Sequence, residues 1–420
     1  MTELPERIDT VVIGAGQAGL TMSHHLQRGG RDHVVLERRS TLGGGWQDRW
    51  DGFRLVGPNW TASFPDAAYD GPDPDGYMPR DEIIGRVASY AARIGAPVAL
   101  DVEVQRLRAV DGGLVLQTSQ GPVRARSVIV ATGGFHRPNV PELAASLPGR
   151  VRSLHAHDYR RPTDLPPGGV LVIGSAQTGV QLVEELRAAG REVFLSVGSA
   201  GRVPRRYRGH DIFWWLWQLA ERGDELGQRL PRVADLPSPT RRYAGNPALS
   251  GHGGGHEVDL RALGREGTVL VGRVVAVDGE RLRLADDLPR NLDAADRFFD
   301  ERFRTLCDAF ATAAGLDLPA PEAPLRTDFD PPVREELDLR AAGITSVLWT
   351  TGYRQDYGWI EPSITDELGF ARQANGVTEV PGLSLIGSLW QVDQTSATLF
   401  GMPRDARSLA ATLGLGEGVG

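Results

Sequence analysis

The sequence predicts an α/β protein with two Rossmann-like dinucleotide-binding domains, because two similar segments each combine an apolar strand, a glycine-rich turn and an amphipathic helix. The first segment is VVIGAGQAGL, Val11 to Leu20, and the second is GVLVIGSAQTGV, Gly169 to Val180. Two further strands end in a small residue followed by Thr-Gly, at 131–133 and 350–352. Strands that alternate with helices form parallel sheets, and glycine turns of this kind hold phosphates at a helix N-terminus.

The first turn has the spacing of a dinucleotide fingerprint. Gly14 is expected to make the tight turn, Gly16 to let the backbone approach a diphosphate, and Gly19 to let the helix pack on the strand. Gln17 and Ala18, in the same turn, are also expected to contact the cofactor. Glu37 ends the next strand, where a carboxylate binds ribose hydroxyls and repels a 2′-phosphate. We therefore expect FAD or NAD at this turn, and not NADP.

Composition limits the classes of function. The chain has 420 residues, room for two or three domains, and its net charge of −8 argues against a nucleic-acid partner. No apolar run approaches the roughly 20 residues of a membrane span, and the short leader before Asp9 leaves no space for a targeting signal, so we expect a cytoplasmic protein. Cys307 is the only cysteine and there is no lysine. A C-x-x-C redox pair, a cysteine zinc cluster and Schiff-base catalysis are therefore excluded.

A segment rich in glycine and tryptophan, Thr41 to Trp60, follows Glu37. Its Gly45 and Trp46 are expected to approach a flat ligand, although a flexible loop is the alternative. The pattern then predicts a helix over 80–94 and strands over 99–104, 113–118 and 123–125. Val104, at the end of the first of these strands, is counted among the cofactor contacts. The strand SVIVATGG should bring three more to the nucleotide: Ala131, Thr132 and Gly133.

The second turn carries Gly174, Ala176 and Gly179 at the fingerprint positions, completed by Ser175, Gln177 and Thr178. Alanine in the middle makes this a weaker signal than the first. We read the following strand as ending in Ser196, an uncharged residue at the position of Glu37. Arginines lie just beyond it and can pair with a 2′-phosphate, although a solvated basic loop is the alternative: Arg202, Arg205, Arg206 and Arg208. We therefore expect NADP at this turn.

The second half of the chain continues with an aromatic segment, a glycine-histidine loop and further strand ends. DIFWWLWQLA, from Asp211, predicts a core-facing helix, with a substrate tunnel wall or a membrane-surface contact as alternatives. The loop SGHGGGHEVDL, 250–260, is placed near the nicotinamide, and 294–314 is expected to be helical. Thr351 and Gly352 repeat the strand-end pattern of the first half. A strand ending at Gly387 precedes Gln391 and a helix over 395–413, whose N-terminus near Ser396 would suit an anionic reduced flavin.

Together these motifs resemble the class B flavoprotein monooxygenases, which include the flavin-containing, Baeyer–Villiger and YUCCA-like monooxygenases. The family's motifs recur in its order: both fingerprints, the Gly-Gly-x-Trp at 43–46, the Ala-Thr-Gly at 131–133 and TTGY at 350–353. The signature F-x-G-x-x-x-H-x-x-x-Y/W is kept in part. His155 and Tyr159 keep their spacing, but Leu147 replaces the aromatic residue and Gly149 lies six residues before His155 rather than four.

The resemblance implies an FAD domain formed by 1–165 and 331–420, with an NADPH domain, 166–330, inserted between them. It implies that NADPH reduces the flavin, which captures O2 as a C4a-hydroperoxide and passes one oxygen atom to a small organic substrate. It offers Asn59, His155 and Tyr159 as catalytic residues and no metal. Two alternatives stay open: an NAD(P)H reductase that passes electrons to a partner or quinone, and a non-catalytic FAD/NADPH redox sensor. The oligomeric state, for example a homodimer, is also left open.

Overall fold

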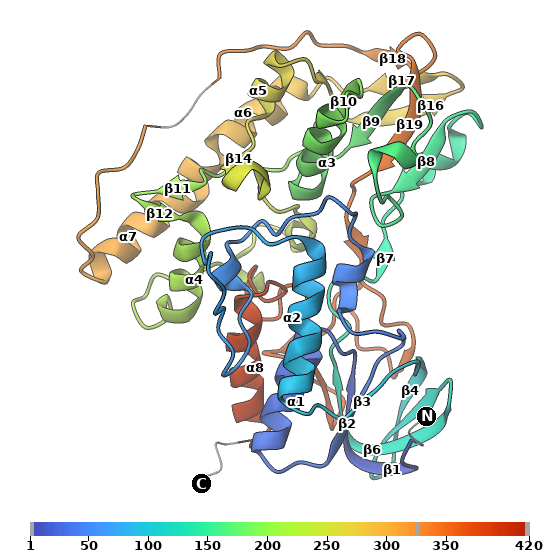
Figure 1. The fold of residues 1–420 in the computed structure, drawn as a ribbon, viewed down its shortest axis with the longest axis vertical. Helices are drawn as coiled ribbons and strands as arrows, with labels where there is room; N and C mark the ends of the chain where they lie inside the picture. The colour runs from blue at the N-terminus through green and yellow to red at the C-terminus, as the bar shows by residue number, and fades with distance from the viewer. Residues whose placement is uncertain (1–3, 324–326, 416–420) are drawn as a thin grey trace.

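The computed structural model describes residues 4–323 and 327–415. The chain forms two lobes, each built on a largely parallel sheet, and two short strands cross between the lobes (Figure 1). These crossing strands pair antiparallel: β7 (Arg137–Pro138) and β20 (Tyr353–Arg354). The predicted α/β class with two Rossmann-like units is confirmed.

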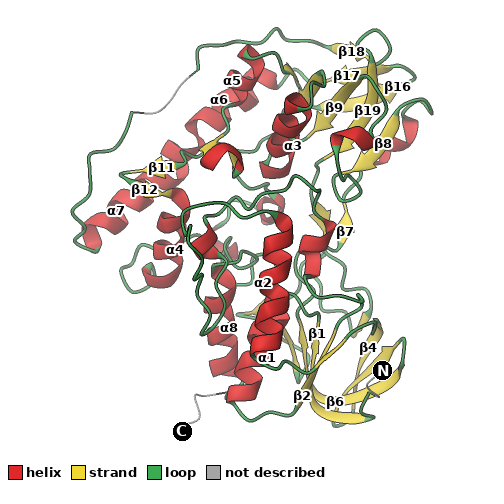
Figure 2. Ribbon diagram, viewed as in Figure 1, coloured by secondary structure: helices red, strands yellow, loops and turns green. Residues whose placement is uncertain are grey.

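The first lobe has the strand order β21-β4-β5-β6-β1-β2-β3, and β24 pairs with β6. Its parallel part consists of β1 (Arg7–Ile13), β2 (His33–Leu36), β3 (Val98–Ala99), β6 (Gly121–Val130) and β24 (Leu383–Leu385). The other strands are β4 (Val104–Val110), β5 (Gly113–Thr118), β21 (Ile360–Glu361), β22 (Gln373–Ala374) and β23 (Val377–Thr378). Helices lie together on one side of this sheet (Figure 2): α1 (Gln17–Arg28), α2 (Arg80–Arg93) and α8 (Gly401–Thr412).

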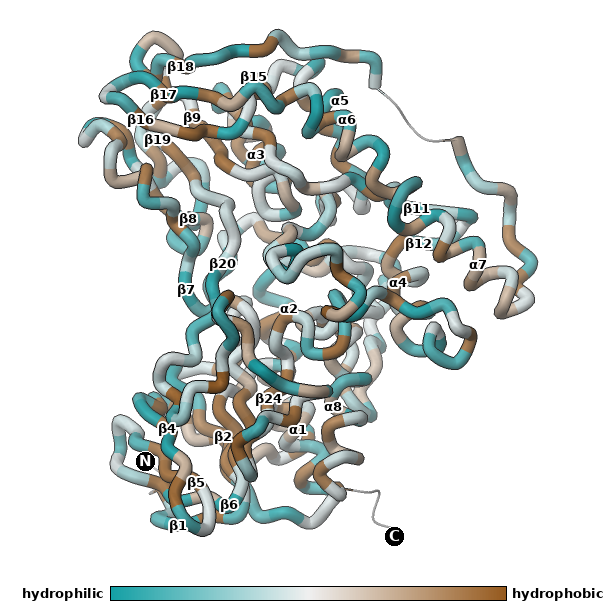
Figure 3. Tube along the Cα trace, turned by 180° about the vertical axis from the view of Figure 1, so that it is seen from behind, coloured by the Kyte–Doolittle hydropathy of each residue, from teal (hydrophilic) through white to brown (hydrophobic). Residues whose placement is uncertain are grey.

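Both faces of this sheet are covered, and successive side chains of its central strands point to opposite faces. Val12 and Val35 pack with residues of α1 and α8, whereas Val11 and Ile13 pack on the opposite face with residues of β4, β5 and β6. This alternation is the two-residue period of a strand covered on both sides. Figure 3 shows hydrophobic residues concentrated along such central strands.

The second lobe has the strand order β15-β10-β9-β19-β8. All its pairs are parallel: β8 (Arg152–His155), β9 (Gly169–Ile173), β10 (Val193–Ser196), β15 (Val269–Val271) and β19 (Ile344–Trp349). A small antiparallel sheet adjoins it: β16 (Val274–Asp278), β17 (Arg281–Leu284) and β18 (Glu336–Asp338). Its helices are α3 (Gln177–Ala188), α5 (Leu260–Arg265), α6 (Leu288–Phe299) and α7 (Thr305–Ala313).

A tryptophan-rich helix, α4 (Ile212–Arg222), follows a hairpin of β11 (Arg206–Tyr207) and β12 (His210–Asp211). Trp215 is fully buried, which confirms the core-facing prediction for one face of α4, whereas Trp217 is 36% exposed. The glycine-histidine loop contains a second hairpin, β13 (Leu249–Ser250) with β14 (His256–Glu257). Among the described residues, no helix is both long and apolar enough to cross a membrane.

The predicted domain boundaries do not follow the sheets. β8 lies before residue 166, and β18 and β19 lie after residue 330, yet all three belong to the second lobe. Parallel strands pair across long sequence separations, so no local pattern marked this membership. The predicted helix over 395–413 is also shorter, because α8 begins at Gly401 after a series of turns.

Candidate cofactor and active site

The first glycine turn has the geometry of a dinucleotide site. Gly14 adopts a φ of +105°, and a Cβ there would lie 2.7 Å from the carbonyl oxygen of Ala131. The turn therefore fits only glycine and lies directly on the Ala-Thr-Gly strand end. Among the described residues, no side chain caps α1 at Gly16, so its N-terminal N–H groups suit a diphosphate. Gly44 approaches the same turn, since a Cβ on it would lie 3.1 Å from the Gly16 Cα.

Glu37 is buried at the end of β2, beside this turn. Its Oε2 accepts a hydrogen bond from the Ala15 N–H at 2.8 Å, and its Oε1 accepts one from the Arg39 N–H at 3.1 Å. The carboxylate is thus fixed where the ribose of a bound dinucleotide would lie. Val102, whose N–H donates to the Glu37 carbonyl, lies next to it, whereas Val104 begins β4 and packs in the core below. The sequence reasoning missed Val102, because only the pairing shows where the chain returns to β2.

Gly387, Gln391 and Ser396 lie in the chain between β24 and α8. Gly387 lies against α1, since a Cβ on it would be 2.9 Å from the Ala18 Cβ. Both amide atoms of Gln391 and the Ser388 hydroxyl are buried without a partner among the described residues. Unpaired buried polar groups are costly, so this set fits a ligand with its own donors and acceptors, such as the pyrimidine edge of a flavin.

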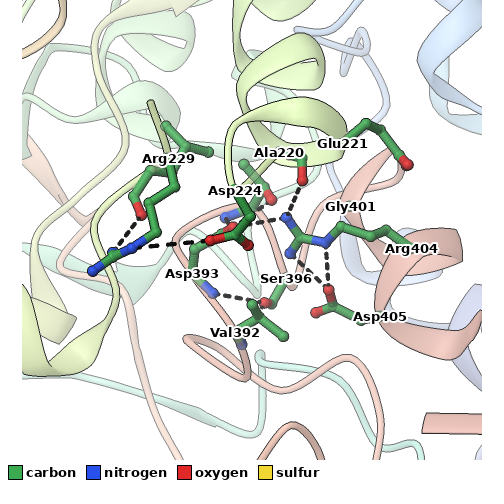
Figure 4. A network of polar contacts seen from close by, with 12 residues as sticks. Ala220, Glu221, Asp224, Arg229, Val392, Asp393, Ser396, Gly401, Arg404 and Asp405 are labelled. Carbon is green, nitrogen blue, oxygen red and sulfur yellow. Dashed lines mark hydrogen bonds and ion pairs between the residues drawn. The ribbon is translucent and has the colours of Figure 1, made fainter. Parts of the chain in front are cut away.

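Ser396 has a structural role in this segment. Its Oγ accepts hydrogen bonds from the N–H groups of Val392 and Asp393, five residues or more before α8 begins. Arg404, on α8, holds the same segment through its ion pair with Asp393 at 2.7 Å, and it also pairs with its neighbour on α8, Asp405, at 2.6 Å (Figure 4). Arg404 also donates to the Ala220 carbonyl of α4, so the tryptophan-rich helix is tied to this segment.

The second turn repeats the first, but the strand register corrects one prediction. The Gly174 N–H donates to the Ser196 carbonyl just as the Gly14 N–H donates to the Leu36 carbonyl. Ser196 is therefore equivalent to Leu36, and Val197 is the residue at the position of Glu37. The Ser196 hydroxyl is buried and donates to the Gly272 carbonyl at 3.1 Å. Val197 still provides no carboxylate, so nothing at this position repels a 2′-phosphate.

Two of the predicted phosphate-binding arginines are buried and form ion pairs with carboxylates of the protein. Arg202 is buried and forms ion pairs with Asp259 at 2.6 Å, Asp296 at 3.5 Å and Glu257 at 3.6 Å. Arg205 is buried, pairs with Asp211 at 2.7 Å and donates to the Val56 carbonyl of the first lobe. A further arginine, Arg208, pairs with Asp308. Arg206 is exposed on β11 and is the member of this cluster that remains accessible.

A loop covers part of the second turn. The Gln177 N–H, at the start of α3, donates to the Asn246 carbonyl at 3.2 Å, and a Cβ on Gly245 would lie 2.5 Å from the Ala176 Cβ. The remaining turn residues, Ser175 and Thr178, flank this contact. The Ser175 hydroxyl accepts from the Gly198 N–H. A diphosphate at this helix end would take the place of the Asn246 carbonyl.

The ends of β6 and β19 indicate where the reactive halves of two bound dinucleotides would lie. In a doubly wound sheet the adenosine half lies beyond the second strand, here β2 and β10, so the other half extends past the strand on the opposite side. In the first lobe that strand is β6, which leads into Ala131, Thr132 and Gly133; in the second it is β19, which leads into Thr350, Thr351 and Gly352. The residues that follow meet edge to face, Phe135 and Tyr353, with ring centroids 5.0 Å apart. The reactive halves of two bound dinucleotides would therefore face one seam, the contact between the two strand ends at Phe135 and Tyr353.

His155 lies on the second-lobe side of this seam, whereas Tyr159 packs in the core of the second lobe beside α3. The His155 ring bonds to the Gly352 carbonyl through Nε2 at 3.0 Å, and it is 5.0 Å from the Tyr353 ring. The Tyr159 hydroxyl donates to Glu185 of α3 at 2.8 Å, and burial raises the pKa of both groups. Both side chains are buried and position the Thr-Gly loop and α3, respectively.

Asn59 is buried in the glycine-tryptophan segment. Its Oδ1 accepts from the Met78 N–H at 2.6 Å and its Nδ2 donates to the Asp73 carbonyl at 2.8 Å. Four residues later, the Ser63 carbonyl accepts from the Gln17 side chain at the first turn. The segment is thus anchored to the first dinucleotide turn.

The glycine-histidine loop packs beside α3. His256 pairs with Glu184 at 2.6 Å, which raises the pKa of that histidine. No group of three or more potential metal ligands occurs among the described residues.

Comparison with known proteins agrees with this geometry. Residues 11–208 match the family described as pyridine nucleotide-disulphide oxidoreductase. A flavin-containing monooxygenase from Stenotrophomonas maltophilia superposes with a TM-score of 0.64 at 21% identity, over 98% of this chain and 99% of that one. This chain has the fold of the flavin-containing monooxygenases. The resemblance inferred from the motifs is therefore confirmed.

Sequence relatives extend the comparison. An uncharacterized CzcO-like oxidoreductase from Geobacillus kaustophilus is 29% identical over 96% of this chain and 97% of that protein. The indole-3-pyruvate monooxygenase YUCCA1 of rice is 29% identical over 48% of this chain and 51% of its own length. Although the matched family is named for disulphide chemistry, this flavin-monooxygenase-like chain has only Cys307, which is buried on α7. It cannot form the cysteine pair that such chemistry needs.

Proposed function

We propose that this flavin-monooxygenase-like protein is an NADPH-dependent FAD monooxygenase that transfers one oxygen atom of O2 to a small organic substrate. The observation that carries the proposal is the seam, where the strand ends of two dinucleotide sites approach each other at Phe135 and Tyr353. Two redox cofactors whose reactive halves share one seam can exchange a hydride directly.

The residues of the first lobe fit FAD. Glu37 excludes a 2′-phosphate, Gly16 admits a diphosphate, and the unpaired Gln391 and Ser388 offer hydrogen bonds to a flavin ring. When bound, FAD would supply hydride acceptance and oxygen activation. The second lobe would hold NADPH through Gly174 and the start of α3, with Arg206 as the accessible arginine for the 2′-phosphate.

The chain's own residues would bind, orient and exclude water. His155 holds Gly352 at the nicotinamide side, Arg404 holds the 391–396 segment, and Asn59 holds the 73–78 segment. A monooxygenase needs a reacting centre that is fixed and shielded from water, because water promotes the loss of activated oxygen as hydrogen peroxide.

Isotope labelling tests the proposal. The purified holoenzyme is supplied with NADPH, ¹⁸O2 and a panel of thioethers, amines and ketones, and products are analysed by mass spectrometry. We expect one ¹⁸O atom per product molecule. NADPH oxidation that reduces a quinone without oxygen incorporation would favour a reductase, and flavin and NADPH binding without steady NADPH oxidation would favour a redox sensor.

A further inference from the structure

Arg49 lies over three aromatic rings. Its guanidinium carbon is 4.5 Å from the ring centroid of Phe135, 5.6 Å from that of Phe53 and 6.0 Å from that of Trp46. The residue follows η1 (Gly44–Asp48), the short helix that carries the Gly-Gly-x-Trp motif. Contacts with ring faces fix the guanidinium in position but leave its hydrogen-bond donors available.

In the described part of the chain, the charge of Arg49 lacks a counterion. Among the described residues no carboxylate lies within 4 Å of it, and the adjacent Asp48 is already paired with Arg39 at 2.6 Å. The Arg49 Nε is buried without a hydrogen-bond partner in the described part of the chain, and burial lowers the pKa of this arginine. Arg404, in contrast, is paired with two carboxylates. A half-buried cation of this kind is stabilised when an anion joins it.

The location of Arg49 shows where that anion would lie. Phe135 follows the Thr-Gly strand end of the first lobe, and Tyr353, whose ring touches Phe135, follows that of the second. Arg49 therefore lies at the seam, beside the position that the reactive halves of both dinucleotides would occupy. The diphosphates belong at the N-termini of α1 and α3, so they are not the anion for this position. Phe135 is 48% exposed and adds an apolar surface beside the charge.

We propose that Arg49 binds the carboxylate of the substrate, so that the enzyme acts on small organic acids whose apolar part rests on Phe135. This inference rests on the proposed monooxygenase function. A bidentate guanidinium–carboxylate pair would hold the acid in one orientation, with the rest of the molecule directed along the seam. Arg49 would thus determine which substrates bind, and the chemistry would occur at another atom of the same molecule.

A matched pair of probes tests the inference on the holoenzyme: 3-(methylthio)propanoate and 3-(methylthio)propan-1-ol, which differ in the carboxylate. Binding is measured from the change in the flavin absorbance spectrum, without turnover. We expect the acid to bind about ten- to a hundredfold more tightly than the alcohol, the range of one charge-assisted hydrogen bond. Arg49→Gln should remove this preference and leave the affinity for the alcohol unchanged, and Arg49→Lys should keep part of it.

The controls separate charge from folding. Arg106→Gln removes an arginine that pairs with Glu361 on the outer edge of the first sheet, and it should leave the preference intact. Circular dichroism and flavin content confirm that each variant is folded. Equal binding of both probes to the parent enzyme, binding of neither, or an acid preference that survives Arg49→Gln would each overturn the inference.

Product analysis with the thioethers distinguishes this inference from the proposed function. The balanced reaction is NADPH, H⁺, O2 and thioether to NADP⁺, H2O and sulfoxide, with the sulfoxide oxygen from O2. An acid preference without ¹⁸O incorporation would contradict the monooxygenase proposal. Incorporation of ¹⁸O without an acid preference would contradict the role of Arg49 and leave the monooxygenase proposal intact.

Discussion

The Nε2 of His155 lies 3.0 Å from the carbonyl oxygen of Gly352, the last residue of the second Thr-Gly strand end. The other ring nitrogen, Nδ1, accepts a hydrogen bond from the His157 N–H at 3.1 Å. The ring proton must therefore be on Nε2, which donates to Gly352. Burial lowers the pKa of His155 to about 4, so this imidazole is neutral at pH 7.

This pKa predicts a pH-dependent stability. An unfolded histidine titrates at about 6.5, so between pH 6.5 and 4 the unfolded chain binds more protons than the folded one. The contribution of neutral His155 is thus complete above pH 6.5 and is lost as the pH falls towards 4. His155→Gln cannot be protonated. We expect the stability difference between the parent protein and this variant to shrink by about 2 kcal/mol from pH 7.5 to pH 5.

Urea unfolding of both proteins at the two pH values measures this difference. Other histidines with a lowered pKa, such as the half-buried His25 with a pKa of about 4, affect both proteins equally and cancel. A stability difference that does not change with pH would show that His155 is already protonated or exposed in the folded protein.

Substitutions at two glycines of the first turn should have different effects, one on FAD binding and the other on folding. A Cβ at Gly16 would meet only the Gly44 Cα, at 3.8 Å, so Gly16→Val should fold but lose FAD because its side chain enters the diphosphate position. A Cβ at Gly19 would lie 1.8 Å from the Gly14 carbonyl oxygen, so Gly19→Ala should lose the fold itself. Gly85→Ala, where no atom lies within 4 Å, is the control.

Flavin absorbance per protein and circular dichroism report the two effects separately. Full flavin occupancy in Gly16→Val would contradict the assignment of this turn to FAD.

The register of the second turn predicts a change of nucleotide preference. Val197→Glu would place a carboxylate at the position that Glu37 holds in the first lobe, where it accepts from ribose hydroxyls and repels a 2′-phosphate. We expect the preference for NADPH over NADH, measured as the ratio of kcat/KM, to fall by about ten- to a hundredfold. Ser196→Ala should leave this ratio unchanged, because the Ser196 hydroxyl donates to Gly272 inside the fold.

The arginines after β10 provide a second comparison. Arg206→Ala should weaken the binding of NADPH and leave the binding of NADH unchanged. Arg202→Ala would leave Asp259 and Glu257 without their cation, whereas Asp296 would keep its ion pair with Arg261, and it should cost about 3–5 kcal/mol of stability. These assignments would be reversed if Arg202→Ala gave a stable protein with a changed nucleotide preference and Arg206→Ala left that preference unchanged.

Much of the fold could be predicted because its signals are local. Each dinucleotide turn is a strand, a glycine turn and a helix within about twenty residues, and Gly14 and Gly174 adopt the same backbone conformation, with φ of +105° and +115°. The Trp-rich helix and the helix over 80–94 follow from periodicity in the same way.

The errors concern relationships that depend on distant residues. Whether Ser196 or Val197 matches Glu37 depends on the bond from Gly174 to the strand end, and a shift of one residue is invisible in an apolar strand. The membership of β8 and β19 depends on strand pairing. Arg202 resembled a phosphate ligand because its carboxylate partners, such as Asp259, are far along the chain.

Substitution of Asn59 should change how much of the activated oxygen is lost as hydrogen peroxide. Its Oδ1 is occupied by the Met78 N–H and one Nδ2 hydrogen by the Asp73 carbonyl, so one donor remains. If that donor faces the flavin, as the resemblance implies, Asn59→Ala should leave anaerobic flavin reduction by NADPH almost unchanged. It should nevertheless divert electrons to hydrogen peroxide, because one lost hydrogen bond of about 1–3 kcal/mol speeds the loss of activated oxygen roughly five- to a hundredfold.

Hydrogen peroxide formed per NADPH consumed measures this effect. Removing Asn59 also leaves the Met78 N–H unpaired, so Asn59→Ala should lose stability as well, and stability alone cannot decide the role. Asn59→Asp is the sharper variant, because its carboxylate still accepts from Met78 but has no hydrogen to donate. If Asn59→Asp folds and its peroxide yield equals that of the parent enzyme, Asn59 serves only to hold the 73–78 segment.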